Sequence, residues 1–334
     1  MKSNWIPVIL SLILLIAIIA KMITSGREDK KTENSFSGFV ESEPVDTVWT
    51  TPWNKYQIPM DTDSGKLIWY GLQLISNTSF YLGPKGTVAQ ITNGMNCQNC
   101  HLSAGTTPYG FNFGKVYATY PQYKDRENKI VTIYDRINNC LERSLNGQAM
   151  DSDKREMRAM YSYMKWLGQD VPKDFVPEGT SVMKLKYLTR AADPKAGRNI
   201  FIAECQSCHG NNGQGVLNQD GTGYIYPPLW GGHSYDDGAG MYRITNFAGF
   251  VKNNMPFGTT YKDTRLTDEE AWDVAAYVNS QPRPHKDQQM DWKNLKKKPI
   301  DFPFGPYSDT FSQKQHKYGP FGPIKNSKQL KTST

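Results

Sequence analysis

The sequence predicts a mostly α-helical, loop-rich chain made of two similar halves. Apolar residues recur with helical periodicity at 65–75, 152–168, 193–205 and 267–281. Each half has the order helix, Cys-x-x-Cys-His, long loop, helix, which is a weak internal repeat of about 100 residues. Glycine (28) and proline (20) are frequent among the 334 residues, which favours long loops between those helices.

A proline-rich segment, "DVPKDFVPEG" at 170–179, separates the two halves. We therefore predict a first domain over 49–175 and a second over 176–285. From 286 to 334, prolines, aromatic residues and lysines follow one another without periodicity. We interpret this tail as an extended strap that lies over the domains; the alternative is a disordered basic tail.

The N-terminus carries an uncharged run, residues 3–20, that is mostly isoleucine and leucine. Its length lies at the short end of membrane-spanning helices and exceeds the usual core of a signal peptide. No small-x-small cleavage site follows it. We predict that 1–26 is an uncleaved signal anchor, a single transmembrane helix, and that 27–48 is a polar linker. A cleaved signal peptide is the alternative.

The net charge of +7 is mild, and it favours an anionic substrate or an acidic protein partner. The chain has no arginine-rich motif and no array of basic and aromatic residues. We therefore expect no nucleic acid among its partners.

Four of the five cysteines belong to two pentapeptides, "CQNCH" and "CQSCH". Cys-x-x-Cys-His is the attachment signature of c-type haem, in which both cysteines form thioethers and the histidine binds the iron. A histidine directly after both pairs argues against a disulfide or a zinc site. We predict two covalently bound haem c groups in two cytochrome c domains, attached through Cys97, Cys100, His101, Cys205, Cys208 and His209. Because such haem is attached outside the cytoplasm, the haem domains are expected on the periplasmic side of the cytoplasmic membrane.

Each haem iron also needs a sixth ligand or an open position. In the second half the candidate is Met255, within "VKNNMPFG", because it follows the Cys-x-x-Cys-His by a long loop and precedes the final helix. Histidine with methionine raises the haem potential and suits electron transfer. Met241, His233 and Lys252 are the rival ligands.

The fifth cysteine, Cys140, lies in the first half at the place where a distal ligand belongs. A thiolate ligand would lower the haem potential, and Arg136 and Arg143 nearby would keep the thiol deprotonated. The alternative is a buried free thiol. Together with Arg126 and Ser144, these arginines predict an oxyanion pocket, although a solvated charged face is the usual fate of arginines.

Four segments together resemble the dihaem c-type cytochrome thiosulfate dehydrogenase (TsdA-type) family: "RINNCLERSLNG", "MRAMYSYMKWLG", "VKNNMPFG" and "KKKPIDFPFGPYSDTFSQKQHKYGPFGPI". The resemblance runs from about Trp49 to Ile324. It implies a catalytic first haem with axial ligands His101 and Cys140, and a second, relaying haem with His209 and Met255. By the same resemblance, the catalytic pocket would contain Cys140, Arg126, Arg136 and Ser144.

The sequence departs from some members of that family at Asn254, where they have a lysine that can bind iron. The implied reaction couples two thiosulfates to tetrathionate and passes two electrons to a cytochrome c or a membrane oxidase. Some members also work in reverse as tetrathionate reductases. Two other functions remain open: a membrane-anchored electron carrier without its own substrate, and an enzyme that loads thiosulfate onto a carrier protein.

Overall fold

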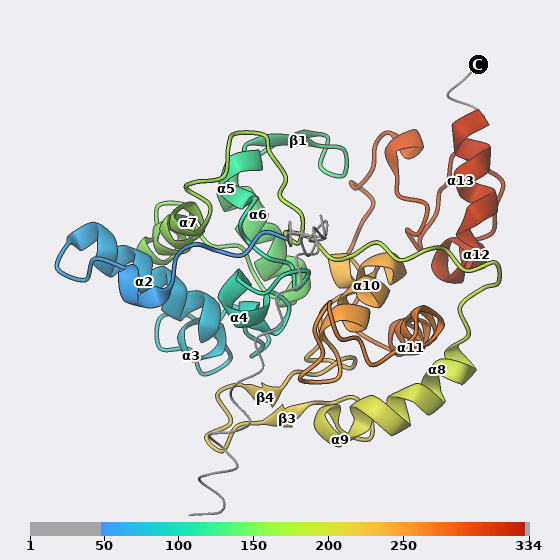
Figure 1. Cartoon of the computed structure of the whole chain (residues 1–334), viewed down its shortest axis with the longest axis horizontal. Coiled ribbons are helices and arrows are strands. Elements are labelled where there is room, and N and C mark those ends of the chain that lie inside the picture. The colour runs from blue at the N-terminus through green and yellow to red at the C-terminus, as the bar shows by residue number, and fades with distance from the viewer. Residues whose placement is uncertain (1–47, 331–334) are drawn as a thin grey trace, which may run out of the picture. The chain divides into compact units, whose positions relative to one another are not determined.

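The computed structural model describes residues 48–330, drawn in colour in Figure 1. These described residues form one compact unit. The predicted anchor over 1–26 and almost all of the linker over 27–48 lie outside the described residues. Within 48–330, no helix combines the length and the apolar character needed to cross a membrane.

The first half surrounds a core between a long early helix and a long late one. Helix α2 (Asp63–Ser76) packs on α7 (Arg155–Leu167), and Gly71 allows this close approach, because a Cβ there would lie 2.0 Å from the Ala159 carbonyl oxygen. The other elements are η1 (Lys55–Gln57), α3 (Thr78–Leu82), η2 (Cys97–Asn99), α4 (Leu102–Gly105), α5 (Val116–Thr119), β1 (Gln122–Lys124), β2 (Lys129–Val131), α6 (Ile133–Asn139) and the π-helical turn η3 (Cys140–Ser144).

The second half repeats this arrangement. Helix α8 (Pro194–Ile200) packs on α11 (Asp268–Ser280), and a Cβ at Gly197 would lie 1.9 Å from the Asp273 carbonyl oxygen. The same glycine contact at the same place in both halves agrees with the weak internal repeat. The remaining elements are the π-helical η4 (Phe201–Cys205), α9 (Gln206–His209), β3 (Val216–Leu217), β4 (Tyr224–Tyr226), η5 (Gly240–Tyr242) and α10 (Ile244–Asn254).

The four predicted helices are confirmed within a few residues, as α2, α7, α8 with η4, and α11. Each half also has its own cluster of buried apolar side chains, one built from residues 58–167 and the other from residues 192–324. The boundary near residue 175 stays a prediction, because all of the described residues 48–330 belong to one compact unit.

The tail is less extended than the sequence predicted. Residues 286–312 are mostly irregular, but α12 (Gln313–Tyr318) and α13 (Phe321–Leu330) end the described chain, after the short η6 (Leu295–Lys297). The Ser312 hydroxyl caps α12, and Phe321 and Ile324 are buried in the second core. Packing of these two side chains therefore holds α13 against the second core. The alternative of a disordered tail is wrong for residues up to 330.

Candidate active site

Both Cys-x-x-Cys-His motifs hold their histidine in the same way. His101 donates a hydrogen bond from Nδ1 to the Phe111 carbonyl oxygen at 2.6 Å, and His209 does so to Pro227 at 2.8 Å. This hydrogen bond fixes the ring and leaves Nε2 available for a metal. Both motifs therefore suit the proximal ligand of a haem iron.

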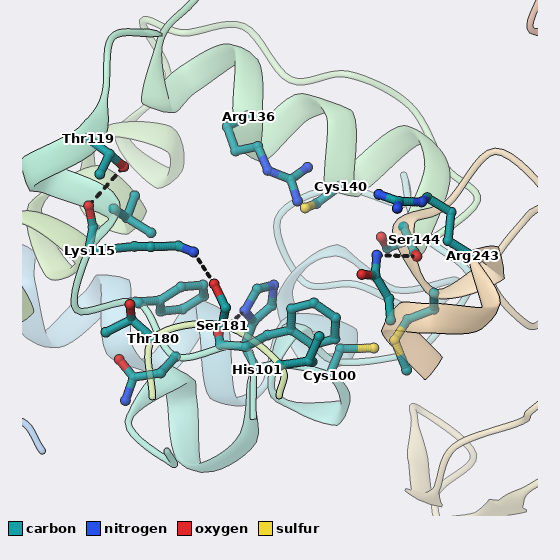
Figure 2. Close-up of a pocket in the computed structure, with 18 of the residues that line it drawn as sticks. Cys100, His101, Lys115, Thr119, Arg136, Cys140, Ser144, Thr180, Ser181 and Arg243 are labelled. Carbon is teal, nitrogen blue, oxygen red and sulfur yellow. Dashed lines mark hydrogen bonds between the residues drawn. The ribbon is translucent and has the colours of Figure 1, made fainter. Parts of the chain in front are cut away.

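A cavity of about 1190 Å³ opens beside the first motif. Cys97, Cys100 and His101 line it, and the His101 ring stacks on Phe113 with centroids 4.3 Å apart. Figure 2 shows Cys140 on the helical wall that faces His101. A space of this size, with two thiols and an imidazole on one wall, a further thiol on the other and apolar side chains between them, fits haem c.

Cys140 is held at the start of η3, which continues directly from α6. Thr132 and Asp135 form a capping box that starts α6, and the π-helical turn then widens the helix at the cysteine, as is frequent at functional sites. Burial raises the pKa of the Cys140 thiol, but Arg136, a hydrogen bond with His101 and the charge of Arg126 together lower it to about 6. The thiolate is therefore the main form at neutral pH.

Arg136 lies four residues before Cys140, so both side chains are on the same helix face. The two lie together on the wall of the cavity (Figure 2). The Cys140 thiolate raises the pKa of Arg136, and the Tyr120 hydroxyl forms a hydrogen bond with the guanidinium. Ser144, at the end of the turn, lines the same cavity. The structure thus brings Arg136, Cys140 and Ser144 together.

The other two arginines behave differently. Arg126 is not part of the cavity lining; its Nε and Nη2 donate to Glu127 Oε1 at 2.9 and 2.6 Å, and it acts on Cys140 only through its charge. The expectation for Arg143 is wrong, because its guanidinium points away and donates two hydrogen bonds to Asp291 at 2.8 and 2.9 Å. Arg143 therefore ties the turn to the tail and does not act on the thiol.

Sequence reasoning missed most of the positive charge in the cavity. Seven basic residues line it: Lys115, Lys124, Arg136, Lys184, Lys186, Arg243 and Lys325. Asp301 is the one carboxylate among its lining residues, and Arg243 donates to it at 2.9 and 2.6 Å. These cations come from segments spread between residues 115 and 325. The sequence could indicate them only through the net positive charge of the chain.

The second motif lies against the second core. Met255 follows α10 and is partly buried against that core, which fits the predicted role, but its place opposite His209 stays a prediction. The rival ligands for the second iron have other partners or lie elsewhere. Lys252 donates to the Leu266 carbonyl oxygen at 2.6 Å and pairs with Asp268 at 3.2 Å, and Met241 lines the cavity of the first motif. His233 is exposed.

Two family models match the two halves. The SoxA/TsdA cytochrome c domain matches residues 87–172, and the Cytochrome c family matches residues 194–282. Each match contains one Cys-x-x-Cys-His motif. The chain therefore has two cytochrome c domains and two covalently bound haem c groups.

Similar proteins point to one family. A thiosulfate dehydrogenase of Psychrobacter arcticus is 41% identical over 235 residues, which are 70% of this chain and 69% of that protein. One of Allochromatium vinosum is 42% identical over 198 residues, 58% of this chain and 72% of that protein. The solved "as isolated" form of thiosulfate dehydrogenase (TsdBA) from Marichromatium purpuratum matches with a TM-score of 0.65 and 30% identity, over 72% of this chain and half of that longer chain. The chain therefore belongs to the thiosulfate dehydrogenase family of dihaem c-type cytochromes.

Proposed function

We propose that this chain is a dihaem thiosulfate dehydrogenase that couples two thiosulfates to tetrathionate. Two thiosulfate dianions give one tetrathionate dianion and two electrons, so one S–S bond forms and no proton is exchanged. The observation that carries the proposal is the Cys140 thiol, which faces His101 in a cavity whose charged lining residues are seven Lys or Arg and a single carboxylate, Asp301. Thiosulfate dehydrogenase relatives at 41% and 42% identity support it.

The bound haems supply one-electron acceptors, one electron each, so the pair takes up both electrons of a turnover. The chain's own residues have to bring two dianions together. At an effective dielectric constant of 20, two dianions about 6 Å apart repel by about 11 kcal/mol. Arg136 and the lysines of the cavity offset this repulsion, and the guanidinium is suited to a sulfonate because it donates two parallel hydrogen bonds.

We propose that Cys140 carries the first thiosulfate. As two electrons leave, the Cys140 sulfur bonds to the outer sulfur of thiosulfate and forms a singly charged thiosulfonate adduct. The outer sulfur of the second thiosulfate then attacks that adduct, which releases tetrathionate and restores the Cys140 thiolate. Arg136 and Ser144 hold the sulfonate in this scheme. The reverse sequence is tetrathionate reduction, and the proposal includes it.

The remaining roles follow from the two-haem arrangement. His209 and Met255 would ligate the second iron, which relays electrons to a cytochrome c or a membrane oxidase. We also propose that 1–26 anchors the chain in the cytoplasmic membrane with the haem domains on the periplasmic side. That anchor lies outside the described residues, and its support is the apolar run over 3–20.

The test uses the protein with both haems attached, thiosulfate and an artificial one-electron acceptor. We expect one tetrathionate for every two electrons, and the reverse reaction with a reduced viologen. If the intact protein turns over neither substrate, the enzyme proposal is wrong, and a carrier without its own substrate explains the two haems better.

A further inference from the structure

A group of basic residues lies beside Arg136, and the scheme above uses them only as part of the positive charge of the cavity. Lys124 is the last residue of β1, and its Nζ lies 5.4 Å from the centroid of the Tyr120 ring. The Tyr120 hydroxyl forms a hydrogen bond with Arg136. Tyr120 therefore connects the Lys124 ammonium and the Arg136 guanidinium within one wall of the cavity.

Lys115 adds a third cation to this region. It precedes α5, and its Nζ donates a hydrogen bond to the Ser181 hydroxyl. Figure 2 shows Lys115 reaching towards Ser181 from the same side of the cavity as Thr119, away from Cys100. Gln122, on the same short strand as Lys124, also lines the cavity and supplies an amide. The region therefore offers ammonium, amide and guanidinium donors close together.

The charges of this region are poorly balanced by the protein itself. Burial lowers the pKa of Lys115, and Lys124, Arg136 and Lys184 lower it further. Burial also lowers the pKa of Lys124, as does Arg136.

The neighbouring carboxylates only partly compensate. Glu127 and Asp125 raise the pKa of Lys124, but Glu127 already accepts hydrogen bonds from Arg126 and Asn139. A bound dianion would relieve the repulsion among these cations.

We propose that Lys124 and Lys115, with Gln122, form a second dianion subsite that holds the second thiosulfate beside the one at Cys140 and Arg136. The inference rests on the proposed function. To form the S–S bond, the two outer sulfurs must meet while the two sulfonates stay apart. One sulfonate is bound at Arg136, and the other therefore needs a separate set of cations, which this wall supplies.

The first test measures binding without turnover. The fully reduced protein accepts no electrons, so equilibrium dialysis with thiosulfate counts sites directly. We expect two bound thiosulfates per wild-type chain. Lys124→Gln and Lys115→Gln should each bind only one. The matched control is Lys129→Gln, because Lys129 pairs with Lys124 across the hairpin but is exposed outside the cavity and contacts Asp135. It should keep both sites.

The second test measures turnover with the artificial acceptor. Lys124→Gln should raise the thiosulfate concentration at half-maximal rate on the order of tenfold, while Lys129→Gln stays within about twofold of the wild type. Fewer than two sites in the wild type, or equal results for Lys124→Gln and Lys129→Gln, would overturn the subsite.

A competing assignment gives both lysines to the haem carboxylates. It predicts a changed reduction potential and absorption spectrum of the first haem in thiosulfate-free Lys124→Gln, with two sites retained, and that result also overturns the subsite. Failure of the proposed function looks different. In that case two thiosulfates still bind the reduced wild type and one is lost in the variant, but no tetrathionate forms.

Discussion

Arg136 and Cys140 lie one helical turn apart and share one wall of the cavity, and the guanidinium is the strongest influence that lowers the thiol's pKa against the effect of burial. The pairing links the chemistry of the thiolate to a single neighbouring charge. The two roles can be tested by separate mutations, because Cys140 supplies the sulfur and Arg136 supplies the positive charge beside it.

Arg136→Gln should lower kcat/KM for thiosulfate by roughly tenfold to a hundredfold, since it removes a charge-assisted contact to the substrate and the charge that stabilises the thiolate. Steady-state kinetics with an artificial acceptor measure this loss. Arg126→Gln is the control, because Arg126 acts on Cys140 from outside the cavity, and its effect should be clearly smaller. Equal losses in both variants would contradict the geometry.

Cys140→Ala should abolish tetrathionate formation and leave both haems attached, because the thioether cysteines belong to the two Cys-x-x-Cys-His pentapeptides. The haem content is measured from the pyridine haemochrome. We also propose that Cys140 ligates the first haem iron, so the spectrum of that haem should change in the variant. A variant that retains turnover would sink the covalent route through Cys140.

Asp236→Asn should stabilise the protein increasingly as the pH rises from 5 to 8. Burial raises the pKa of the Asp236 carboxyl to about 7; its Oδ1 accepts a hydrogen bond from Gly238 at 2.8 Å, and its Oδ2 is buried without a partner in the described structure. A raised carboxyl pKa stabilises the folded state below the unfolded pKa, near 4, and that stability is lost as the pH rises through about 7.

The difference in free energy of unfolding between this variant and the wild type should reach on the order of 1–4 kcal/mol above pH 7. Thermal unfolding of the protein with both haems, followed across pH, measures it. A difference that does not depend on pH would show that Asp236 is ionised throughout.

Gly71→Ala and Gly197→Ala should each destabilise the protein by about 1–3 kcal/mol, because the new methyl group meets a carbonyl oxygen of the facing helix and forces the pair apart. Gly322→Ala in α13 is the control, since its Cβ meets no atom within 4 Å. Melting temperatures of the three variants decide the matter; similar values for all three would mean that the helix pairs adjust freely.

The sequence predicted what depends on local pattern. The helices have regular apolar spacing, and a side chain caps α2, α8 and α11. Cys-x-x-Cys-His is a fixed chemical signature. Both predictions were therefore confirmed. Arg143 shows the limit: it lies three residues after Cys140, but the π-helical turn and the half-buried Asp291, 148 residues later, decide where its side chain goes. The helices α12 and α13 were missed because they are short and flanked by prolines, and only burial of Phe321 and Ile324 reveals them.

The bond between Arg143 and Asp291 has a consequence for how this protein can be divided. The turn that carries Cys140 is also held by the second half, since the Asp236 amide donates to the Arg143 carbonyl oxygen at 3.0 Å. The thiol is therefore positioned by three stretches of chain that lie far apart in sequence. The two halves are therefore not interchangeable modules. Fusing the first half to another electron-transfer domain would keep Cys140 but lose the contacts from Asp236 and Asp291 that position its turn.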